Sequence, residues 1–216
     1  NPQRELLTAS LNALNEQVDE IFLGDNSVNM PDFITTLLNL YPNTYYHSFN
    51  KNLGIAEAQN RGIIYFQKKG FDFVLFMDQD SLAPNNLVSS LLADYNRLKE
   101  IGIPIGGIGP RPFNRGEGKP YVGAVKKGKL ILPKITEVGE IISSASLIPI
   151  PHFKQVGGME SSLFIDGVDH EWCWRAKKIG GWRFFISESV QLSHQVGEGD
   201  RPFIFRKVAI PTPFRT

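Results

Sequence analysis

The sequence predicts an α/β domain built on a doubly wound sheet. Segments with helical spacing alternate with short apolar runs over the first two thirds of the chain, and a polar turn follows each of three such runs. In addition, 216 residues with 42% hydrophobic content are enough to bury one large core. We therefore expect a single domain across residues 1–216, with the polar turns gathered at one edge of the sheet.

The first 100 residues alternate regularly in period. Apolar residues recur at helical spacing over residues 4–17, 31–41, 54–69 and 84–100, which predicts four helices. Short runs rich in apolar, aromatic or β-branched residues predict strands at 20–24, 44–49 and 71–77. Such alternation favours a parallel sheet, in which ligands gather at the carboxyl ends of the strands. The turns at 24–27, 50–54 and 77–81 should converge there.

The pattern loosens after residue 100. Glycine and proline are frequent in residues 101–120, and this predicts a loop-rich segment. The remaining patterns indicate a β-hairpin over 121–133 that turns at Lys-Lys-Gly-Lys, a strand over 140–150, a helix over 169–181, and two short strands at 182–186 and 190–194. No internal repeat or low-complexity tract interrupts these elements.

The composition excludes several classes of protein. A formal net charge of +1 with 21% charged residues gives no overall basic surface for a nucleic acid, so we expect no nucleic-acid partner. No run of eighteen apolar residues is present, so no membrane span is expected. The single cysteine, Cys173, rules out an internal disulfide framework and is compatible with a reducing compartment.

Two carboxylates, Asp78 and Asp80, follow the apolar run at 71–77. Side chains two positions apart on an extended chain point the same way, so both could face one cation. Oxygen ligands at a solvent-open strand end suit Mg²⁺ or Mn²⁺, which would share its coordination with a phosphate-bearing substrate. The alternative is a solvated turn in which Asp80 caps the helix that begins near Pro84. The pair alone leaves both interpretations open.

A second group of acids, Asp166, Asp169 and Glu171, lies at the start of the predicted helix at 169–181. The helix dipole favours acidic residues at this position, which is one sufficient explanation. One of these carboxylates could instead be a general base, because a partly apolar site beside Trp172 and Trp174 would raise its pKa towards neutrality. Spacing alone does not decide between the two.

Together these stretches resemble a known family. The segments that carry the resemblance are FLGDNS, NKNLGIAEAQNRGI, FVLFMDQDS, ISSASLIPI, FIDGVDHEWCWRAKKIGG and VQLSHQVGEG, between about residue 20 and residue 200. They are similar to the inverting family-two glycosyltransferases of the GT-A fold, and within these to bacterial rhamnosyltransferases. The resemblance implies a mixed, Rossmann-like sheet flanked by helices, and a metal-dependent enzyme.

The resemblance also implies a role for each turn. Asp25 matches the acid that contacts the base or ribose of the nucleotide, and Asn52, Gly54 and Asn60 match the segment beside it. The metal site would comprise Asp78, Asp80 and His194, with Mg²⁺ or Mn²⁺ bridging the donor diphosphate.

For the acids at 166–171, the resemblance implies that Asp169 is the catalytic base. Val168 and Glu171 stand where the family's Glu-Asp-x-Asp pattern has its first and last acids, which leaves Asp166 as a candidate second carboxylate. Arg175 matches an arginine one turn along the helix, although it could simply pair with Glu171 four positions earlier. Asp169 and Glu171 should diverge by about 200° around a helix axis, so they should not share one target.

The implied activity is transfer of a sugar, expected to be rhamnose from dTDP-rhamnose, to a saccharide or lipid-linked acceptor in cell-surface polysaccharide synthesis. Residues 1–110 would form the nucleotide-sugar half and residues 111–216 the acceptor half. A cytoplasmic location is expected, at the inner face of the membrane if parts outside this chain associate with it. The family's first strand, which ends in Tyr-Asn, has no match here, so we expect that strand to be missing from the sheet and both termini to be trimmed.

Two alternatives to this function remain. FMDQDSL also resembles the haloacid-dehalogenase phosphatase motif, in which the first aspartate is a nucleophile, but that motif belongs on the first strand. The other alternative is a nucleotide-sugar-binding domain without catalysis, which the retained aspartates argue against.

Overall fold

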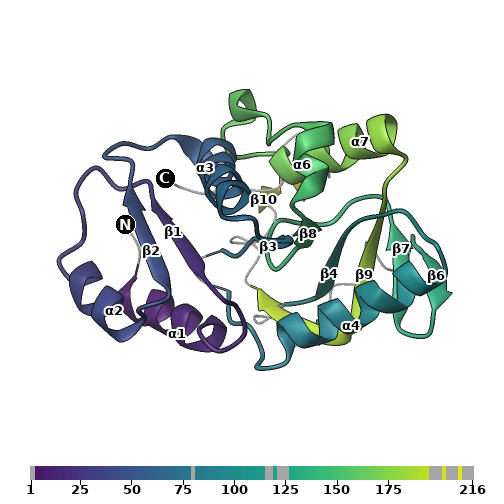
Figure 1. The fold of residues 1–216 in the computed structure, drawn as a ribbon, viewed down its shortest axis with the longest axis horizontal. Helices are drawn as coiled ribbons and strands as arrows, with labels where there is room; N and C mark the ends of the chain where they lie inside the picture. Colours follow the sequence, from purple (N-terminus) through teal and green to yellow (C-terminus); the bar gives the residue numbers. More distant parts are fainter. Residues whose placement is uncertain are drawn as a thin grey trace.

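Helices lie on both faces of a mixed sheet in the computed structural model, which describes residues 3–78, 81–114, 119–120, 127–194, 201–202 and 209–210 (Figure 1). The elements of the first 100 residues are α1 (Arg4–Leu14), β1 (Ile21–Asp25), α2 (Ile34–Leu40), β2 (Thr44–Ser48), α3 (Gly54–Lys69), β3 (Phe73–Leu75) and α4 (Leu87–Glu100). The seven elements predicted there are confirmed. Helix α3 has the predicted bounds, whereas α2 and α4 begin three residues later than predicted.

The later elements are β4 (Ile105–Asn114), β5 (Lys119–Pro120), β6 (Lys129–Leu132), β7 (Ile135–Val138), β8 (Leu147–Pro149), α6 (Pro151–Val156), η1 (Ser161–Leu163), α7 (Val168–Gly180), β9 (Arg183–His194), β10 (Arg201–Pro202) and β11 (Ala209–Ile210). Helix α7 confirms the predicted helix. The loop-rich prediction for 101–120 was wrong, because β4 is a ten-residue strand. The two predicted closing strands are one continuous strand, β9.

Two further predictions need correction. The hairpin in this region joins β6 to β7, so it turns at residues 133–134 and not at Lys-Lys-Gly-Lys; residues 121–126 of the predicted hairpin lie outside the described residues. Of the predicted strand at 140–150, only β8 is extended, because residues 143–146 form a turn in which Ser146 N donates to Ser143 O.

The described strands form one large sheet and two small ones, of which β10 and β11 make an antiparallel pair. The large sheet has the order β3-β8-β4-β9-β7-β6, with β5 beside β4. Only β4 and β9 run parallel in it, and its other pairs are antiparallel, so the sheet is mixed and not fully parallel. Strands β1 and β2 pair in parallel as a separate two-stranded sheet. Among the described strands, β1 and β3 therefore belong to different sheets and do not pair with each other.

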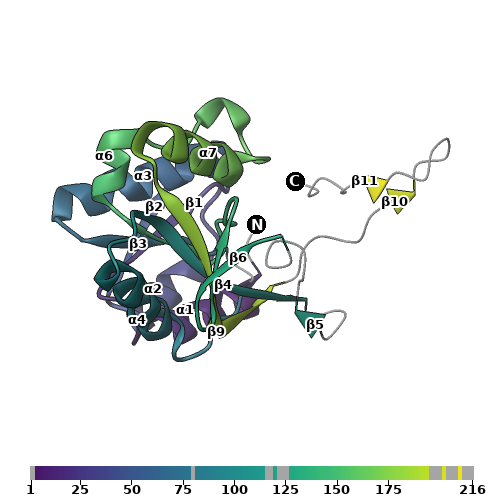
Figure 2. The ribbon, with the colours of Figure 1, turned by 90° about the vertical axis from the view of Figure 1, so that its right-hand side faces the viewer.

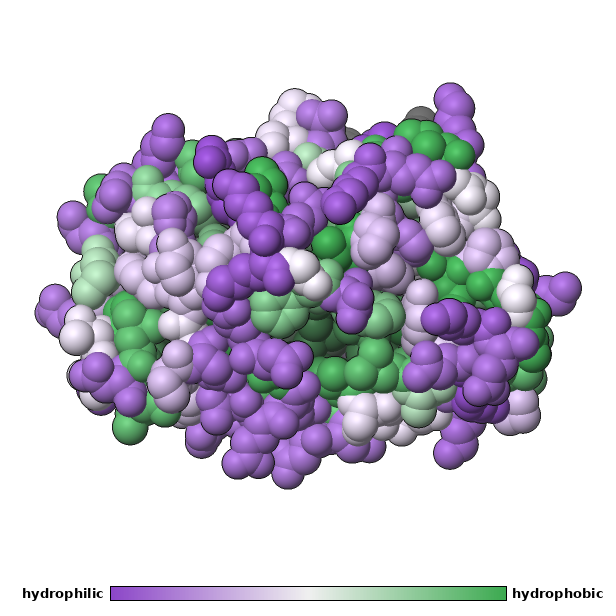
Figure 3. Space-filling view, in the orientation of Figure 1, coloured by the Kyte–Doolittle hydropathy of each residue, from purple (hydrophilic) through white to green (hydrophobic). Residues whose placement is uncertain are grey.

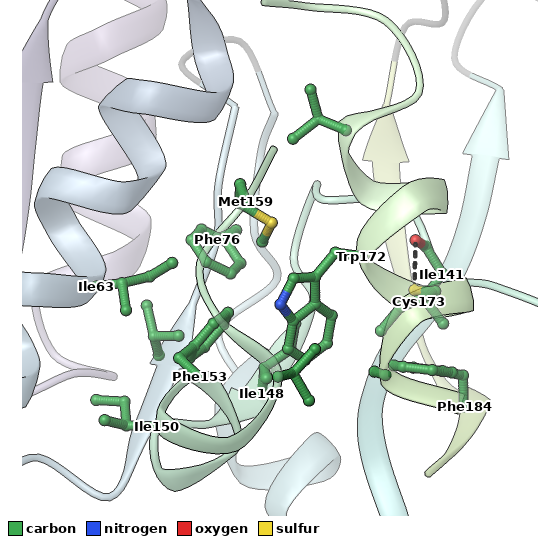
Figure 4. Close-up of a cluster of buried hydrophobic side chains, with 14 of the residues drawn as sticks. Ile63, Phe76, Ile141, Ile148, Ile150, Phe153, Met159, Trp172, Cys173 and Phe184 are labelled. Atoms are coloured by element: carbon green, nitrogen blue, oxygen red, sulfur yellow. Dashed lines mark hydrogen bonds between the residues drawn. The ribbon is translucent and has the colours of Figure 1, made fainter. Parts of the chain in front are cut away.

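The helices bury apolar stripes on the two faces. In the view of Figure 2, α3, α6 and α7 lie on one side of the strands and α1, α2 and α4 on the other. The core between β8, β9, α6 and α7 contains Phe153, Trp172 and Phe184, and Trp172 is 1% exposed (Figure 4). Trp172 also donates from Nε1 to Gly157 O over 2.9 Å, so its indole is both packed and hydrogen-bonded. This core fixes the start of α7. Among the helices of the described ranges, none combines the length and hydrophobicity needed to cross a bilayer.

Candidate active site

Strand β1 ends in a carboxylate that is 8% exposed, Asp25. Its Oδ2 accepts a hydrogen bond from the Tyr46 hydroxyl over 2.7 Å, and its Oδ1 accepts one from Ser27 N over 2.8 Å. Burial, together with the bond to Asp25, raises the pKa of Tyr46 to about 12, so the phenol stays a donor at neutral pH. The orientation of Asp25 at the strand end is therefore fixed.

The turn after β1 is joined to the turn before α3 by Asn26. Its Oδ1 accepts from Leu53 N over 2.9 Å, and its Nδ2 donates to Gly54 O over 3.3 Å. Asn52 closes the second turn by accepting from Gly54 N over 2.9 Å. Two of the three predicted turns thus lie side by side. Asn26 was not among the predicted site residues, although its place directly after a strand-end aspartate is typical of a turn residue.

The start of α3 packs tightly against a loop from the second half of the chain. Gly54 has φ of +79°, and a Cβ there would lie 2.5 Å from Phe164 Cδ2 and 2.6 Å from Phe164 O. Ile55 N donates to the same carbonyl over 2.7 Å. Asn60 accepts from Met159 N over 2.7 Å and donates to Met159 O over 2.9 Å. Both ends of the Asn60 amide are thus engaged, and this residue holds the loop against α3.

The third turn follows β3, whose extension reaches the half-buried Asp78. Asp80 lies outside the described residues, so the predicted convergence of Asp78 and Asp80 on one cation stays a prediction. Just beyond it, Leu82 forms an antiparallel bridge with Ser193, next to His194 at the end of β9. The backbone therefore brings the two segments of the predicted metal site together. The side chain of His194 also lies outside the described residues.

The turn at 143–146 connects this third turn to α7. Ser143 N donates to Asp169 Oδ2 over 2.9 Å, while the hydroxyls of Ser144 and Ser81 lie 2.8 Å apart in a buried contact. Ala145, with φ of +60°, donates from its N to Phe76 O over 2.7 Å. Ser143 and Ser144 were not among the predicted site residues, although a run of small polar residues between apolar ones is a turn signal.

Asp169 and Glu171 have different partners, as their spacing predicts. Asp169 Oδ1 accepts from His170 N over 2.9 Å, so both of its oxygens face backbone donors. Glu171 pairs with Arg175 through two contacts, of 2.7 and 2.8 Å. Hydrogen bonds and charge from Glu171 raise the pKa of Arg175.

The same guanidinium of Arg175 donates to Val156 O and Gly158 O, each over 2.7 Å. It thereby anchors the loop after α6 to α7, which agrees with the simpler interpretation of the Glu171–Arg175 pair. Asp166 is exposed on the loop that leads into α7. Trp174 is 58% exposed and donates to Glu140 over 3.2 Å. Within the described ranges, no three His, Cys, Asp or Glu side chains are grouped as metal ligands, and this search included neither Asp80 nor the His194 side chain.

With this geometry established, comparison with known proteins identifies the class. The sequence profile of Glycosyl transferase family 2 matches residues 3–139, which is more than half of the chain, so the chain belongs to this family. The sequence-based expectations of family and fold class are therefore confirmed, and transfer of a sugar is the activity of that class.

A particular relative is the dTDP-rhamnosyl transferase RfbF of Shigella flexneri, which is 29% identical over 223 residues that include 100% of this chain and 73% of that protein. The fold is similar to the crystal structure of GalNAc-T7 with UDP, GalNAc and Mn²⁺, with a TM-score of 0.69 and 14% identity over 89% of this chain. It is also similar to the mannosyltransferase PcManGT of Pyrobaculum calidifontis in complex with GDP-Man and Mn²⁺, with a TM-score of 0.58 and 14% identity over 91% of this chain. The chain spans 41% and 55% of those two solved structures.

These findings disfavour the phosphatase alternative. Its nucleophile should end the first strand, whereas Asp78 follows the third. The chain also belongs to a family of glycosyl transferases.

Proposed function

We propose that this chain is the catalytic domain of an inverting glycosyltransferase that moves rhamnose from dTDP-rhamnose to a saccharide or lipid-linked acceptor. One observation carries the proposal: the turn at 143–146 contacts both Asp169 and the segment that follows β3. A base and the group that receives the donor diphosphate must lie together for one-step displacement. The relative named for dTDP-rhamnosyl transfer supports the choice of donor.

The nucleotide part of the donor is assigned to the joined turns after β1 and before α3. The Asp25 carboxylate accepts one hydrogen bond on each oxygen from the protein, and each oxygen has a second lone-pair site for the base or ribose. Asn52 and Gly54 bring backbone close to the same place. Asn60 contributes by holding the loop at 159–161 against α3.

A divalent cation fits the donor set of Asp78, Asp80 and His194. Two carboxylates and an imidazole beside the open end of a strand suit Mn²⁺ or Mg²⁺, and the bridge between Leu82 and Ser193 brings their two segments together. Both solved structures named above contain Mn²⁺. When bound, such a cation would neutralise the charge that develops on the departing diphosphate.

Asp169 is assigned as the base that accepts the proton of the acceptor hydroxyl. The amide of Ser143 fixes the direction of Oδ2, while a second lone-pair site on each oxygen stays available for a proton. Attack on the anomeric carbon opposite the leaving group inverts its configuration in one step. This chemistry needs no nucleophilic side chain. The buried Cys173, whose pKa burial raises to about 12, is accordingly unsuited to that role.

The division of the chain into a donor half, 1–110, and an acceptor half, 111–216, is part of the same proposal. The boundary falls within β4, so the two halves would share a strand of the large sheet. A lipid-linked acceptor would bring the domain to the inner face of the membrane from the cytoplasm.

Thermal unfolding with dTDP, UDP and GDP, each with and without Mn²⁺, tests the donor assignment. Ligand at 100 times its Kd stabilises the folded state by about 2.7 kcal/mol, or about 5–10 °C in Tm for a domain of this size. We expect this shift with dTDP and Mn²⁺ together, and its loss in Asp78→Asn. Equal shifts for the three nucleotides would contradict the thymidine preference. A metal-independent shift that persists in Asp78→Asn would contradict the cation site. Release of dTDP from dTDP-rhamnose on addition of acceptor then distinguishes an enzyme from a binding domain.

A further inference from the structure

Helix α7 carries a large aromatic side chain that points away from the core. Trp174 is 58% exposed, whereas Trp172, two positions earlier, is 1% exposed. The buried residues of the helix are Val168, Trp172, Cys173 and Ala176, and at about 100° per residue Trp174 lies nearly opposite their centre. Exposure alone does not make a site, because single apolar side chains are common on protein surfaces. The contacts of this indole distinguish it from such residues.

Two neighbours hold the Trp174 indole in one orientation. Its Nε1 donates to Glu140 Oε2 over 3.2 Å. The ring of His170, one turn earlier on α7, packs against it edge to face, with the ring centroids 6.2 Å apart. A side chain whose torsions are already restricted loses less entropy when a ligand binds. Trp174 therefore offers a fixed aromatic surface to a ligand.

The same two neighbours connect Trp174 to Asp169. His170 Nδ1 lies 3.6 Å from Glu140 Oε1, and His170 Nε2 lies 3.7 Å from Asp169 Oδ1. The side chains of Asp169, His170 and Glu140 are 23%, 40% and 38% exposed, so a ligand can reach all three. The four side chains from Asp169 to Trp174 thus form one accessible surface that begins at the assigned base.

This surface has the chemistry that a saccharide requires. A sugar ring presents an apolar face of C–H groups, which packs on an aromatic ring, and a rim of hydroxyl groups, which need hydrogen-bonding partners. The indole supplies the apolar surface, while Glu140 and His170 supply polar groups at its edge. From Asp169 to Trp174 the helix advances about 7.5 Å, at about 1.5 Å per residue, which is comparable to the length of a disaccharide.

The charges around Trp174 disfavour an anionic membrane as its partner. Such a surface would meet the carboxylates of Glu140 and Asp169, although Lys177 and Lys178 follow in the last turn of the helix. Over α7, at the upper right of Figure 3, hydrophilic residues adjoin hydrophobic ones, so the visible part of this face is not a continuous apolar patch. A hydroxyl-rich ligand suits this mixture better.

We propose that Trp174, Glu140 and His170 bind the acceptor saccharide, with a sugar ring stacked on the indole and its hydroxyl groups bound to the carboxylate and the imidazole. A sugar held there would direct a hydroxyl of the adjoining sugar to Asp169 Oδ1. All three residues lie outside residues 3–139, the part that matches the family profile. The inference rests on the proposed function, because it takes Asp169 as the base.

The first experiment measures KM for the saccharide in Trp174→Ala, Glu140→Ala and Ile179→Ala. Ile179, 51% exposed on the same helix, is the matched control. The probes are the methyl glycosides of rhamnose, glucose and N-acetylglucosamine, offered as acceptors with dTDP-rhamnose. We expect Trp174→Ala to raise KM by about 10-fold and to change kcat less, because stacking stabilises the ground state and the transition state alike. Glu140→Ala should raise KM by about 3-fold, and Ile179→Ala should keep the parent value.

The second experiment needs no turnover, so it separates this proposal from the proposed function. The three tryptophans give three indole N–H resonances in isotopically labelled protein, and the same glycosides are titrated without nucleotide. We expect the Trp174 resonance, identified by its loss in Trp174→Phe, to shift until it saturates, and the resonance of the buried Trp172 to stay in place. Saturable binding without any sugar transfer would support the saccharide site while contradicting the proposed function.

Three outcomes would overturn the proposal. A Trp174 resonance that none of the glycosides shifts means that no sugar stacks on the indole. Sugar transfer with the parent KM in Trp174→Ala means that the acceptor binds elsewhere, while the proposed function stands. Binding to phosphatidylglycerol vesicles, or self-association, that is lost in Trp174→Ala but kept in Ile179→Ala would assign the indole to a membrane or to a second copy of the chain.

Discussion

Replacing either acid at the start of α7 by its amide separates proton transfer from structure. Asp169→Asn and Glu171→Gln each keep the size of the side chain and one of its two acceptor oxygens. We expect Asp169→Asn to lower kcat by on the order of 100-fold or more, because an amide cannot accept the proton of the acceptor hydroxyl. Glu171→Gln should lower it by only a few fold, because Glu171 faces Arg175 and not the turn at 143–146.

The structure makes the two variants a matched pair in stability. Asp169 loses one of two backbone hydrogen bonds, from Ser143 N or from His170 N, and Glu171 loses one of two contacts with Arg175. Each loss should cost about 1–2 kcal/mol for these partly exposed groups, or about 2–8 °C in Tm. A 100-fold fall in rate corresponds to about 2.7 kcal/mol in the barrier. Equal stability with unequal rate therefore identifies the base.

The assay is dTDP release from dTDP-rhamnose in the presence of acceptor, at a temperature well below both Tm values. Nucleotide affinity, measured by the dTDP shift, should be unchanged in both variants, because neither acid is assigned to the nucleotide. If Asp169→Asn transfers at nearly the parent rate while Glu171→Gln is inactive, the base has been assigned to the wrong carboxylate.

Three further predictions concern residues around the site. Gly54→Ala should lower stability and donor affinity more than Gly70→Ala: both positions have φ near +80°, but a Cβ at Gly54 would lie 2.5 Å from an aromatic carbon, whereas at Gly70 nothing lies within 4 Å. Burial lowers the pKa of His152, so below about pH 6.5 the unfolded state takes up a proton before the folded state does. The free energy of unfolding, measured with urea, should therefore fall as the pH drops below about 6.5. His152→Gln should remove this pH dependence, and a variant with the same pH profile as the parent would contradict the prediction. Ser144→Ala removes the contact with Ser81 and should lower the free energy of unfolding by about 0.5–1.5 kcal/mol. It should reduce kcat more than dTDP affinity, and an equal loss in both would contradict a positioning role for Ser144.

Local periodicity was sufficient to predict the elements from α1 to α4, but it failed for β4. Glycines and prolines in residues 105–114 are typical of loops, yet here they mark a crowded strand. A Cβ at Gly106 would lie 2.8 Å from Phe184 Cζ and 2.9 Å from Trp182 Cβ, so glycine is needed for close packing. The register with β9 shifts between Pro110 and Arg111, where proline cannot donate to the ladder. The packing partners of Gly106 lie at the start of β9, about 75 residues away, beyond the reach of a local pattern.

The candidate site was predictable only in part, for a similar reason. Side chains with distinctive chemistry at strand ends, such as Asp25 and Asp78, were found because their position follows from the alternation of elements. Ser143 holds Asp169 through its backbone amide, and any residue type except proline could do so. The Asn60 contacts with residues 159 and 161 span about 100 positions. The local sequence therefore predicts neither the contact of Ser143 with Asp169 nor the contacts of Asn60.

The segment from 156 to 165 connects the two functions of the site. At one end, Arg175 and Trp172 on α7, the helix that carries Asp169, donate hydrogen bonds to the carbonyls of residues 156–158. At the other end, Phe164 O receives the amides of Ile55 and Ala56, beside the turn assigned to the nucleotide. Between them, Asn60 binds Met159 from α3. A displacement of this segment would therefore move the helix that carries Asp169 and the turn at Gly54 together, whereas an amide at Asp169 leaves the segment in place. Donor affinity and turnover should thus change jointly for alterations in the segment and separately for alterations of the base.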